Sequence, residues 1–508
     1  MKKILIANRG EIAVRVIRAC REMDISPVAV FSECDRTALH VRLADEAYPI
    51  GPSAPRESYL RIDRLIEVAR RSGADAVHPG YGFLAENEEF ASAVQSAGLT
   101  YIGPSPEAIA LMGSKTAARN AAARAGVPIV PGNDAPVPPE ASDVEIEQIA
   151  AAVGYPLLVK AVAGGGGKGM RTITAPAELR DGVRAARSEA GAAFGDSAIY
   201  IERRLTRPRH IEVQLLGDRF GTVLPFVERE CSIQRRHQKV VEETPSPVVT
   251  PELRSRITSA AAAVARGVGY ENTGTIEFLL DEDGRFYFLE MNTRLQVEHP
   301  ITEMVTGVDL VRAQIRIARG ERLDLDPARV LQASGHAVEC RIYAEDPDNH
   351  FLPSPGRILQ MRAPSGPGIR DDSSATAGLE VPIFYDPMIS KLVAWAEDRP
   401  SALARMRRAL DEYIVTGIRT TLPFFRWLFI QPDFLAGRFH TTYLDDVLRE
   451  RNGRPFVDVP PSAEEVAAAA AALQALMSPG SGSTHTAEPD VDQPQRRWRS
   501  QARTEALN

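Results

Sequence analysis

The first thirty residues alternate between strand-like and helix-like patterns, and this alternation restricts the chain to folds of the α/β class. Residues 4–7 and 28–31 are apolar runs of strand length. Between them, Ile12, Val16 and Cys20 recur at helical spacing. A strand, a helix and a second strand in this order predict a βαβ unit of a parallel sheet.

The same alternation continues beyond this unit. A helical segment at 58–71 and short apolar segments at 76–77 and 101–102 extend it, so we expect residues 1–114 to form an N-terminal doubly wound α/β domain. The turn at residues 7–11 reads ANRGE and lacks the glycine fingerprint of dinucleotide-binding domains. A dinucleotide site is therefore not expected.

The 508 residues are enough for about three domains. Residues 115–330 predict a second domain, in which a Pro-rich stretch at 128–139 opens a smaller lobe over about 131–203. Residues 331–450 mix strand and helix patterns, which indicates a C-terminal α+β domain. The tail, 451–508, contains an Ala run and a Ser/Gly/Pro-rich stretch, which indicate a short helix and otherwise disorder.

Composition excludes several classes of protein. The net charge of −7 gives no overall attraction to nucleic acids or anionic membranes, so neither is an expected partner. The apolar runs are far shorter than the roughly 20 residues that span a bilayer, and the start turns polar at Asn8, too early for a secretion signal. We therefore expect a cytoplasmic protein. Its widely spaced cysteines, expected to be reduced and buried, are Cys20, Cys34, Cys231 and Cys340.

A run of glycines follows a strand-like segment at 155–162. Residues 164–167 are all glycine, followed by Lys168 and Gly169, and glycines let backbone N–H groups approach phosphate oxygens closely. Lys168 is not followed by Ser or Thr, so the run does not meet the Walker A pattern. Taken alone, the run fits a phosphate-covering loop and a flexible surface loop equally well.

Two apolar runs around an Asp-Gly turn predict a β-hairpin that carries two carboxylates. The runs are 275–280 and 285–290, and a four-residue loop at 282–285 would place Glu277 directly across from Glu290. Carboxylates that face each other repel, so a cation is expected between them. Oxygen ligands of this kind suit Mg²⁺ or Mn²⁺ bridging nucleotide phosphates.

After Glu290, polar residues recur at every second position, as Asn292, Arg294, Gln296 and Glu298. In an extended chain the side chains of Glu290 and of these four residues lie on one side. The order acid, amide, base, amide, acid favours a binding site. A solvated edge strand is the alternative, although such strands more often carry Lys, Thr and Glu.

A third cluster, residues 228–243, concentrates basic residues in an acidic chain. It is short and interleaved with glutamates, so a pocket for a small anion is favoured over a nucleic-acid patch. Lys115, Lys160 and His210 also stand out. Lys160 closes an apolar run, and its side chain either reaches a phosphate or is solvated.

Seven ordered motifs resemble those of biotin carboxylase, the ATP-grasp component of biotin-dependent carboxylases. They are ANRGEIAVR, HPGYGFLAEN, GGGGKGM, ERECSIQRRHQKVVEE, EMNTRLQVEHPITE, HAVECRIYAEDP and FLPSPG. The resemblance covers residues 1 to about 450. It implies an N-terminal α/β domain, an ATP-grasp domain with a mobile lid, and a C-terminal domain.

The resemblance also implies a reaction. Bicarbonate and ATP, with Mg²⁺ or Mn²⁺, would form carboxyphosphate, whose carboxyl group passes to N1′ of biotin on a carrier protein. Bicarbonate is a poor nucleophile until a carboxylate removes its proton, and cations beside it lower the cost of bringing two anions together.

Roles are implied residue by residue. ATP would be held by Lys115, Lys160, Glu202, Leu205, His210, Gln234 and His237, and covered by the lid glycines Gly166 and Gly167. The metal ions would be held by Glu277, Glu290 and Asn292. Bicarbonate would be held by Lys239, Arg294, Gln296 and the backbone of Val297, with Glu298 as the base. Arg341 would bind biotin and stabilise its enolate.

Two positions depart from the family pattern: Ala163 stands in the lid run where a glycine is expected, and Arg203 replaces a common Lys. Neither removes a charge or a ligand. The lysine-centred AMKM motif of a biotin carrier is absent after Glu450, as is any carboxyltransferase. We therefore expect a biotin carboxyl carrier protein and carboxyltransferase subunits on separate chains and, from the family, a homodimer.

The resemblance implies the first half-reaction of an acetyl-CoA or other acyl-CoA carboxylase. It does not choose among acetyl-CoA, propionyl-CoA, other acyl-CoAs and pyruvate as the final acceptor. Two other functions stay open. One is an ATP-grasp ligase for another acid and amine pair, and the other is a catalytically silent scaffold.

Overall fold

The computed structural model describes residues 1–477 apart from 134, 163–169, 196 and 458–459. They belong to two units that divide after Phe456. The second unit contains helix α17 (Pro461–Met477), which includes the Ala run of the tail. The disorder predicted for the rest of the tail, and the glycine run with Gly166 and Gly167, lie outside the described residues.

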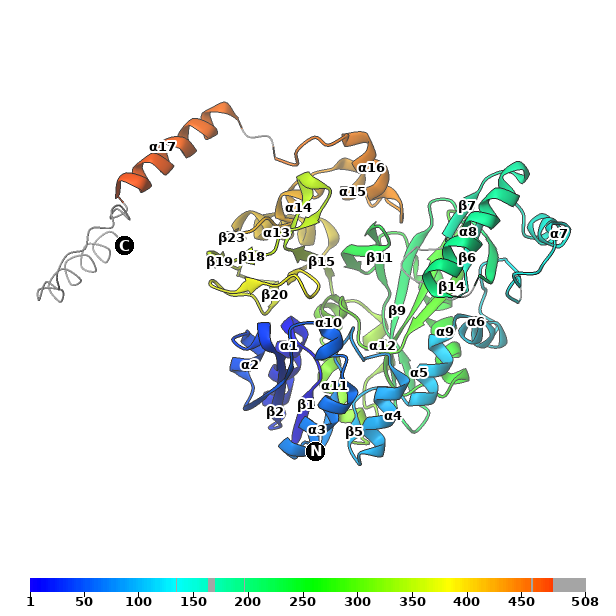
Figure 1. The fold of residues 1–508 in the computed structure, drawn as a ribbon, viewed down its shortest axis with the longest axis horizontal. Helices are drawn as coiled ribbons and strands as arrows, with labels where there is room; N and C mark the ends of the chain where they lie inside the picture. Colours follow the sequence, from blue (N-terminus) through cyan, green and yellow to red (C-terminus); the bar gives the residue numbers. More distant parts are fainter. Residues whose placement is uncertain (134, 163–169, 196, 458–459, 478–508) are drawn as a thin grey trace, which may run out of the picture. The chain divides into compact units, whose positions relative to one another are not determined.

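A parallel five-stranded sheet forms the N-terminal part of the first unit (Figure 1). Its strand order is β3-β2-β1-β4-β5. Its strands are β1 (Lys3–Ile6), β2 (Ser26–Ser32), β3 (Glu46–Gly51), β4 (Ala76–His78) and β5 (Thr100–Tyr101). The helices of this part are α1 (Gly10–Glu22), α2 (Leu39–Leu43), α3 (Ile62–Ser72), α4 (Glu88–Ser96) and α5 (Pro106–Gly113). Strands β1 and β2 pair in parallel around α1, so the βαβ prediction is confirmed.

Helices cover both faces of this sheet because successive residues of a strand point to opposite faces. Ile4 and Ile6 of β1 belong to a core that includes Val16 of α1. Leu5, between them, belongs to another core that includes Leu65 of α3. This arrangement is the doubly wound sheet expected from the sequence.

A small lobe follows, built on the three-stranded sheet β7-β6-β8. Its strands are β6 (Leu157–Ala161), β7 (Met170–Ile173) and β8 (Ile199–Arg203), and its helices are α7 (Asp143–Val153) and α8 (Leu179–Phe194), with α6 (Lys115–Arg124) before them. The lobe has its own core, which includes Val137, Leu157 and Ile201. Strand β6 lies within residues 155–162, so the strand predicted there is confirmed.

The largest sheet has nine strands, in the order β14-β13-β9-β11-β12-β15-β22-β20 with β10 paired to β9. These strands are β9 (Arg209–Gly217), β10 (Val223–Pro225), β11 (Arg229–Arg235), β12 (Gln238–Thr244), β13 (Asn272–Leu280), β14 (Phe286–Asn292), β15 (His336–Tyr343), β20 (Ile369–Ser373) and β22 (Met388–Ala396). Because β12 pairs with β15, the sheet crosses the domain boundary predicted at residues 330/331. The exact domain boundaries stay predictions.

The remaining elements surround this sheet. The helices are α9 (Pro251–Gly267), α10 (His299–Thr306), α11 (Leu310–Ala318), α12 (Pro327–Leu331), α13 (Arg399–Glu412), α14 (Leu422–Leu428), α15 (Pro432–Leu435) and α16 (Tyr443–Arg451). The short strands are β16 (Glu345–Asp346), β17 (Leu352–Pro353), β18 (Gly356–Arg357), β19 (Gln360–Arg362), β21 (Glu380–Val381) and β23 (Ile414–Thr416).

The four cysteines are free, and three of them are buried. Cys34 is exposed, so the expectation that all four are buried is wrong at this position, which lies in a short 3₁₀ turn after β2. Across the residues that the structure describes, no helix is both long enough and apolar enough to span a bilayer.

Candidate active site

The hairpin of β13 and β14 forms, but its turn differs from the prediction. Leu280 lies across from Phe286, and the N–H of Asp281 donates to the carbonyl of Arg285 at 2.9 Å. The turn is therefore one residue shorter than the four-residue loop predicted at 282–285, and that prediction is wrong.

The two carboxylates nevertheless face each other, because a bulge corrects the register. Glu277 pairs with Glu290, whereas its neighbour Phe278 pairs with Phe288. Leu289 is the extra residue in β14, and such a bulge shifts the pairing by one position. The charge of Glu277 raises the pKa of Glu290, which is the repulsion expected of opposed carboxylates.

Lys239 of β12 connects the acidic side chains of the site. Its ammonium lies 2.6 Å from Glu212, 2.8 Å from Glu277 and 2.8 Å from Glu298. Burial alone would lower the pKa of Lys239, but these three carboxylates outweigh burial and raise it well above its ordinary value. Lys239 is thus a fixed positive charge between strands β9, β12 and β13 and the start of α10.

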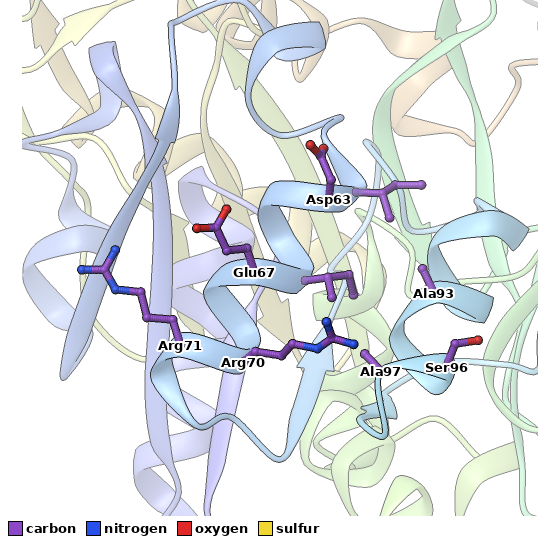
Figure 2. Close-up of a pocket in the computed structure, with 9 residues that line it drawn as sticks. Asp63, Glu67, Arg70, Arg71, Ala93, Ser96 and Ala97 are labelled. Carbon is purple, nitrogen blue, oxygen red and sulfur yellow. The ribbon is translucent and has the colours of Figure 1, made fainter.

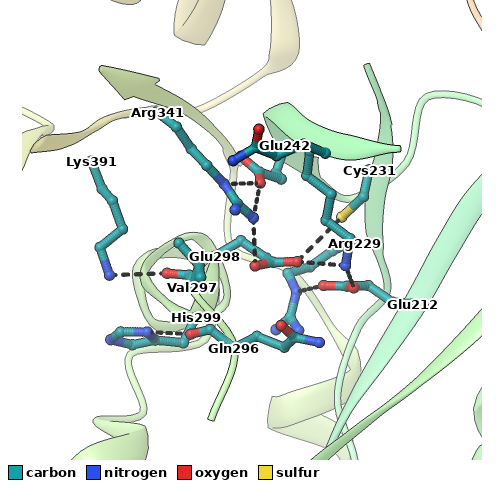
Figure 3. A network of polar contacts seen from close by, with 12 residues as sticks. Glu212, Arg229, Cys231, Glu242, Gln296, Val297, Glu298, His299, Arg341 and Lys391 are labelled. Carbon is teal, nitrogen blue, oxygen red and sulfur yellow. Dashed lines mark hydrogen bonds and ion pairs between the residues drawn. The ribbon is translucent and has the colours of Figure 1, made fainter. Parts of the chain in front are cut away.

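Glu298 lies between two cations at the end of the loop before α10 (Figure 3). Besides Lys239, the guanidinium of Arg341 donates to it, from Nη2 to Oε2 at 2.9 Å. Burial raises the pKa of Glu298, yet the charges of Lys239 and Arg341 outweigh burial and hold this pKa well below its ordinary value. Glu298 is fully buried and ionised at neutral pH.

Arg294 forms hydrogen bonds to two amide side chains of the alternating polar residues at 290–298, here called the polar stripe. Its guanidinium donates to Asn292 at 3.0 Å, to Gln296 at 2.8 Å and to Glu86 at 2.8 Å. Strand β14 ends at Asn292, so the chain is not extended along the whole stripe, and hydrogen bonds rather than strand periodicity bring these side chains together. Strand β14 is the outermost strand of its sheet, and Glu290 is its exposed acidic member.

Residues predicted to hold ATP come together in two groups. Lys160 of β6 donates to Glu202 of β8. His210 of β9 contacts Glu277 at 2.9 Å and Gln234 at 3.0 Å. The structure therefore connects the residues of β9 and β11 that were predicted to hold ATP directly to Glu277, a candidate metal ligand.

Three other predicted ATP residues lie at the ends of elements. Lys115 begins α6, where partial burial lowers its pKa and the charge of Glu290 opposes that effect. Leu205 lies half-buried after β8. His237 is exposed in the turn between β11 and β12, with φ of +65°.

Sequence reasoning missed several residues of this network. Glu212 bridges Lys239 and the fully buried Arg229. Glu242 accepts from Nε of Arg341 at 2.6 Å. Glu242 and Arg229 lie in the basic cluster at 228–243, and Glu86 lies in the HPGYGFLAEN motif, so these three could have been named as candidates. No motif in the sequence contains Glu212.

A hollow of about 1060 Å³ lies elsewhere, on helices α3 and α4 (Figure 2). Glu67 and Arg70 line it from α3, and Ala93 and Ser96 line it from α4. None of the residues described above for the active site lines this hollow.

Comparison with known proteins divides the chain into three matched regions. Residues 1–109 match the family described as biotin carboxylase, N-terminal domain. Residues 114–326 match the ATP binding domain of the carbamoyl-phosphate synthase L chain, and residues 339–446 match the biotin carboxylase C-terminal domain. These matches confirm the predicted architecture of an N-terminal α/β domain, an ATP-grasp domain and a C-terminal domain.

Individual relatives agree with these matches. The chain is 52% identical over 445 residues to biotin carboxylase of a Nostoc species, covering 88% of this chain and 99% of that protein. It is 53% identical over 447 residues to one of the pyruvate carboxylase subunits of Methanothermobacter thermautotrophicus, covering 88% and 90%.

A solved structure is similar at the level of the fold. The biotin carboxylase domain dimer of 2-oxoglutarate carboxylase from Hydrogenobacter thermophilus, in complex with MgADP, ADP and bicarbonate, matches with a TM-score of 0.83 and 46% identity. The match covers 90% of this chain and 99% of that one. By sequence identity, matched domains and fold, the chain belongs to the biotin carboxylase family of ATP-grasp ligases.

Proposed function

We propose that this enzyme carboxylates N1′ of biotin carried by a separate biotin carboxyl carrier protein, and that it does so with the residues described above. One observation supports the proposal most strongly: Glu298 is a buried carboxylate kept ionised between Lys239 and Arg341. A buried base beside two fixed cations suits an anionic substrate that must lose a proton.

Bicarbonate would lie beside Glu298. Lys239, Arg294, Gln296 and the N–H of Val297 would hold its oxygens, and Glu298 would take its proton. The bicarbonate oxygen would then attack the γ-phosphorus of ATP, forming carboxyphosphate and releasing ADP. Positioning and charge neutralisation account for most of the catalysis of such a phosphoryl transfer.

ATP would lie along β6, β8, β9 and β11. Lys115 and Lys160 would meet its phosphates, and the nucleotide would also contact Glu202, Leu205, His210, Gln234 and His237. The residues present fit a divalent cation, because the carboxylates of Glu277 and Glu290 face each other. Asn292 lies beside them, where its amide nitrogen donates to Glu277 at 2.9 Å and its amide oxygen accepts from Arg294. Mg²⁺ or Mn²⁺ held there would neutralise charge on the phosphate oxygens.

Arg341 would meet biotin on the other side of Glu298. Its guanidinium is charged at every accessible pH, so it suits the enolate oxygen that develops when N1′ loses its proton. Glu242 and Glu298 hold that guanidinium in place.

The partners are part of the same proposal. The Hydrogenobacter domain is a dimer in complex with MgADP and bicarbonate, which supports both ligands and a homodimer here. The relatives carry the names of pyruvate carboxylase and 2-oxoglutarate carboxylase, so family membership does not select the acceptor. We retain an acyl-CoA as the proposed acceptor, chosen by carboxyltransferase subunits on other chains.

ADP release from the purified chain tests the proposal. The assay contains MgATP, bicarbonate and free biotin, and each is omitted in turn. We expect ADP release that requires both bicarbonate and biotin. Release without bicarbonate but with another acid would favour a different ATP-grasp ligase, and failure to bind MgATP would favour a silent scaffold. Addition of purified carrier proteins with matching carboxyltransferases and acetyl-CoA, propionyl-CoA or pyruvate then tests the acceptor.

A further inference from the structure

His299 follows Glu298 directly and begins α10. Its side chain is fully buried, and Nδ1 lies 2.8 Å from the carbonyl oxygen of Gln296. A carbonyl oxygen only accepts hydrogen bonds, so Nδ1 must carry the ring hydrogen in this contact. The imidazole thus holds one specific peptide group of the active-site loop.

The peptide that His299 holds is the one that ends in the N–H of Val297. The cis bonds of the described chain precede prolines at 156 and 245, so the Gln296–Val297 bond is trans. In a trans peptide the C=O and the N–H point in opposite directions. Fixing the carbonyl of Gln296 therefore also fixes the direction of the N–H of Val297.

The next peptide is held from the same side. Lys391, a fully buried residue of β22, donates to the carbonyl of Val297 at 2.9 Å. Figure 3 shows both carbonyl oxygens on the side of Lys391 and His299, with the side chains of Gln296 and Glu298 on the other side. The N–H groups of Val297 and Glu298 therefore point away from His299 and Lys391. They point toward the side where Glu298 meets Lys239 and Arg341.

The environment keeps the His299 ring neutral. Burial lowers its pKa well below the ordinary value, and the charges of Lys391, Arg15 and Arg370 act in the same direction. A neutral ring has one hydrogen, and the carbonyl of Gln296 places it on Nδ1. The contact is therefore the same across the pH range in which the enzyme is assayed.

We propose that His299 is a positioning residue for bicarbonate, which aims the N–H of Val297 at the substrate by holding the carbonyl of Gln296. The inference rests on the proposed function, since it assumes that bicarbonate lies at this loop. His299 itself does not touch the substrate. Its loss is expected to weaken bicarbonate binding and to leave MgATP binding intact.

Two amide substitutions test this role in the full-length chain. His299→Asn places an amide nitrogen where Nδ1 stands, so it keeps the donor. His299→Gln is also polar and similar in size, but its amide nitrogen lies where Nε2 stands, so it loses the donor. Steady-state ADP release at saturating biotin gives KM for bicarbonate, KM for MgATP and kcat for each.

His299→Gln is expected to raise KM for bicarbonate at least about fivefold, the effect of one lost hydrogen bond to a buried carbonyl. KM for MgATP should stay within about twofold of wild type, and His299→Asn should keep both constants within about twofold. Equal effects of the two substitutions, an unchanged KM for bicarbonate, or a parallel rise in KM for MgATP would overturn the positioning role.

The tautomer provides a second test that needs no substitution. In wild-type protein with ¹⁵N-labelled histidine, assigned by comparison with His299→Asn, the buried ring should show hydrogen on Nδ1. Hydrogen on Nε2 would overturn the proposal even if His299→Gln failed to fold. Wild-type enzyme that releases no ADP with bicarbonate and biotin would instead count against the proposed function, so the two failures are distinguishable.

Discussion

Arg341 donates a hydrogen bond of 2.9 Å to Glu298, so the guanidinium proposed to meet biotin also holds the carboxylate proposed to take the proton from bicarbonate. Glu242 accepts from the same guanidinium at 2.6 Å. The proposed sites for bicarbonate and for biotin thus share the side chain of Arg341. A change at Arg341 should therefore alter proton transfer as well as biotin binding.

Replacing Arg341 with Met should move the acidic limb of the pH profile to higher pH. A base works only when unprotonated, and its activity is lost as pH falls through its pKa. Arg341 is one of the charges that lower the pKa of Glu298, so its removal raises that pKa. The measurement is kcat/KM for bicarbonate against pH at saturating biotin. Arg341→Lys keeps the charge and should shift the limb less, and equal profiles for both variants would contradict this coupling.

Replacing Glu298 with Gln should lower biotin carboxylation by about 10²- to 10⁴-fold, the usual contribution of a general base. MgATP binding should stay near normal, because Lys239 keeps its contacts with Glu212 and Glu277. Carboxybiotin formation and nucleotide binding are measured separately. Glu380→Gln, which removes an exposed carboxylate in β21, is the control. Turnover near the wild-type rate in Glu298→Gln would remove Glu298 from the base role.

Replacing Glu290 with Gln should raise the concentration of free Mg²⁺ needed for half-maximal activity by about tenfold, because one anionic oxygen ligand is lost. In the wild type, the charge of Glu277 repels Glu290 and raises its pKa. The substitution removes this repulsion, so the free energy of unfolding should not fall. Mg²⁺ titration of ADP release gives the comparison. Asp283→Asn changes an exposed carboxylate in the turn of the same hairpin, and an identical Mg²⁺ requirement in both variants would contradict the ligand role.

The local part of the active site could be predicted from the sequence, because it depends on short-range pattern. The apolar runs and the Asp-Gly turn indicated that Glu277 and Glu290 would face each other, and they do. The predicted loop length was wrong because the prediction assumed regular pairing along the hairpin. The actual turn is one residue shorter, and the bulge at Leu289 restores the pairing of Glu277 with Glu290. A two-for-one pairing leaves no mark in strand alternation, since neighbouring strands determine where a bulge is accommodated.

The long-range part could not be predicted. Glu212 of β9 meets Arg229 because β9 pairs with β11. Glu242 of β12 meets Arg341 because β12 pairs with β15. Lys391 donates to the carbonyl of Val297, although it lies almost a hundred positions later in the chain. Single-sequence patterns specify which strands exist, but the order of strands in an antiparallel sheet depends on tertiary packing.

Replacing Glu243 with Gln should make the folded state less stable in a pH-dependent way. Glu243 is buried and lies 2.8 Å from His336 and 2.7 Å from Arg399. Burial alone would raise its pKa, but the hydrogen bond from His336 and the charge of Arg399 outweigh burial and lower it to about 2. A folded-state pKa below the unfolded value stabilises the protein above the unfolded pKa, and this contribution is lost as pH falls through the folded one.

The wild type should therefore be more stable than Glu243→Gln by about 3 kcal/mol at pH 7, because folding lowers the pKa of this carboxyl to about 2. The difference should shrink as pH falls from about 4.5 toward 2, where the wild-type carboxylate becomes protonated and resembles the amide. Urea unfolding of both proteins at pH 7, 4.5 and 3 measures it, and the other carboxylates cancel in the comparison. A difference that stays constant over this range would show that Glu243 contributes through packing rather than through its charge.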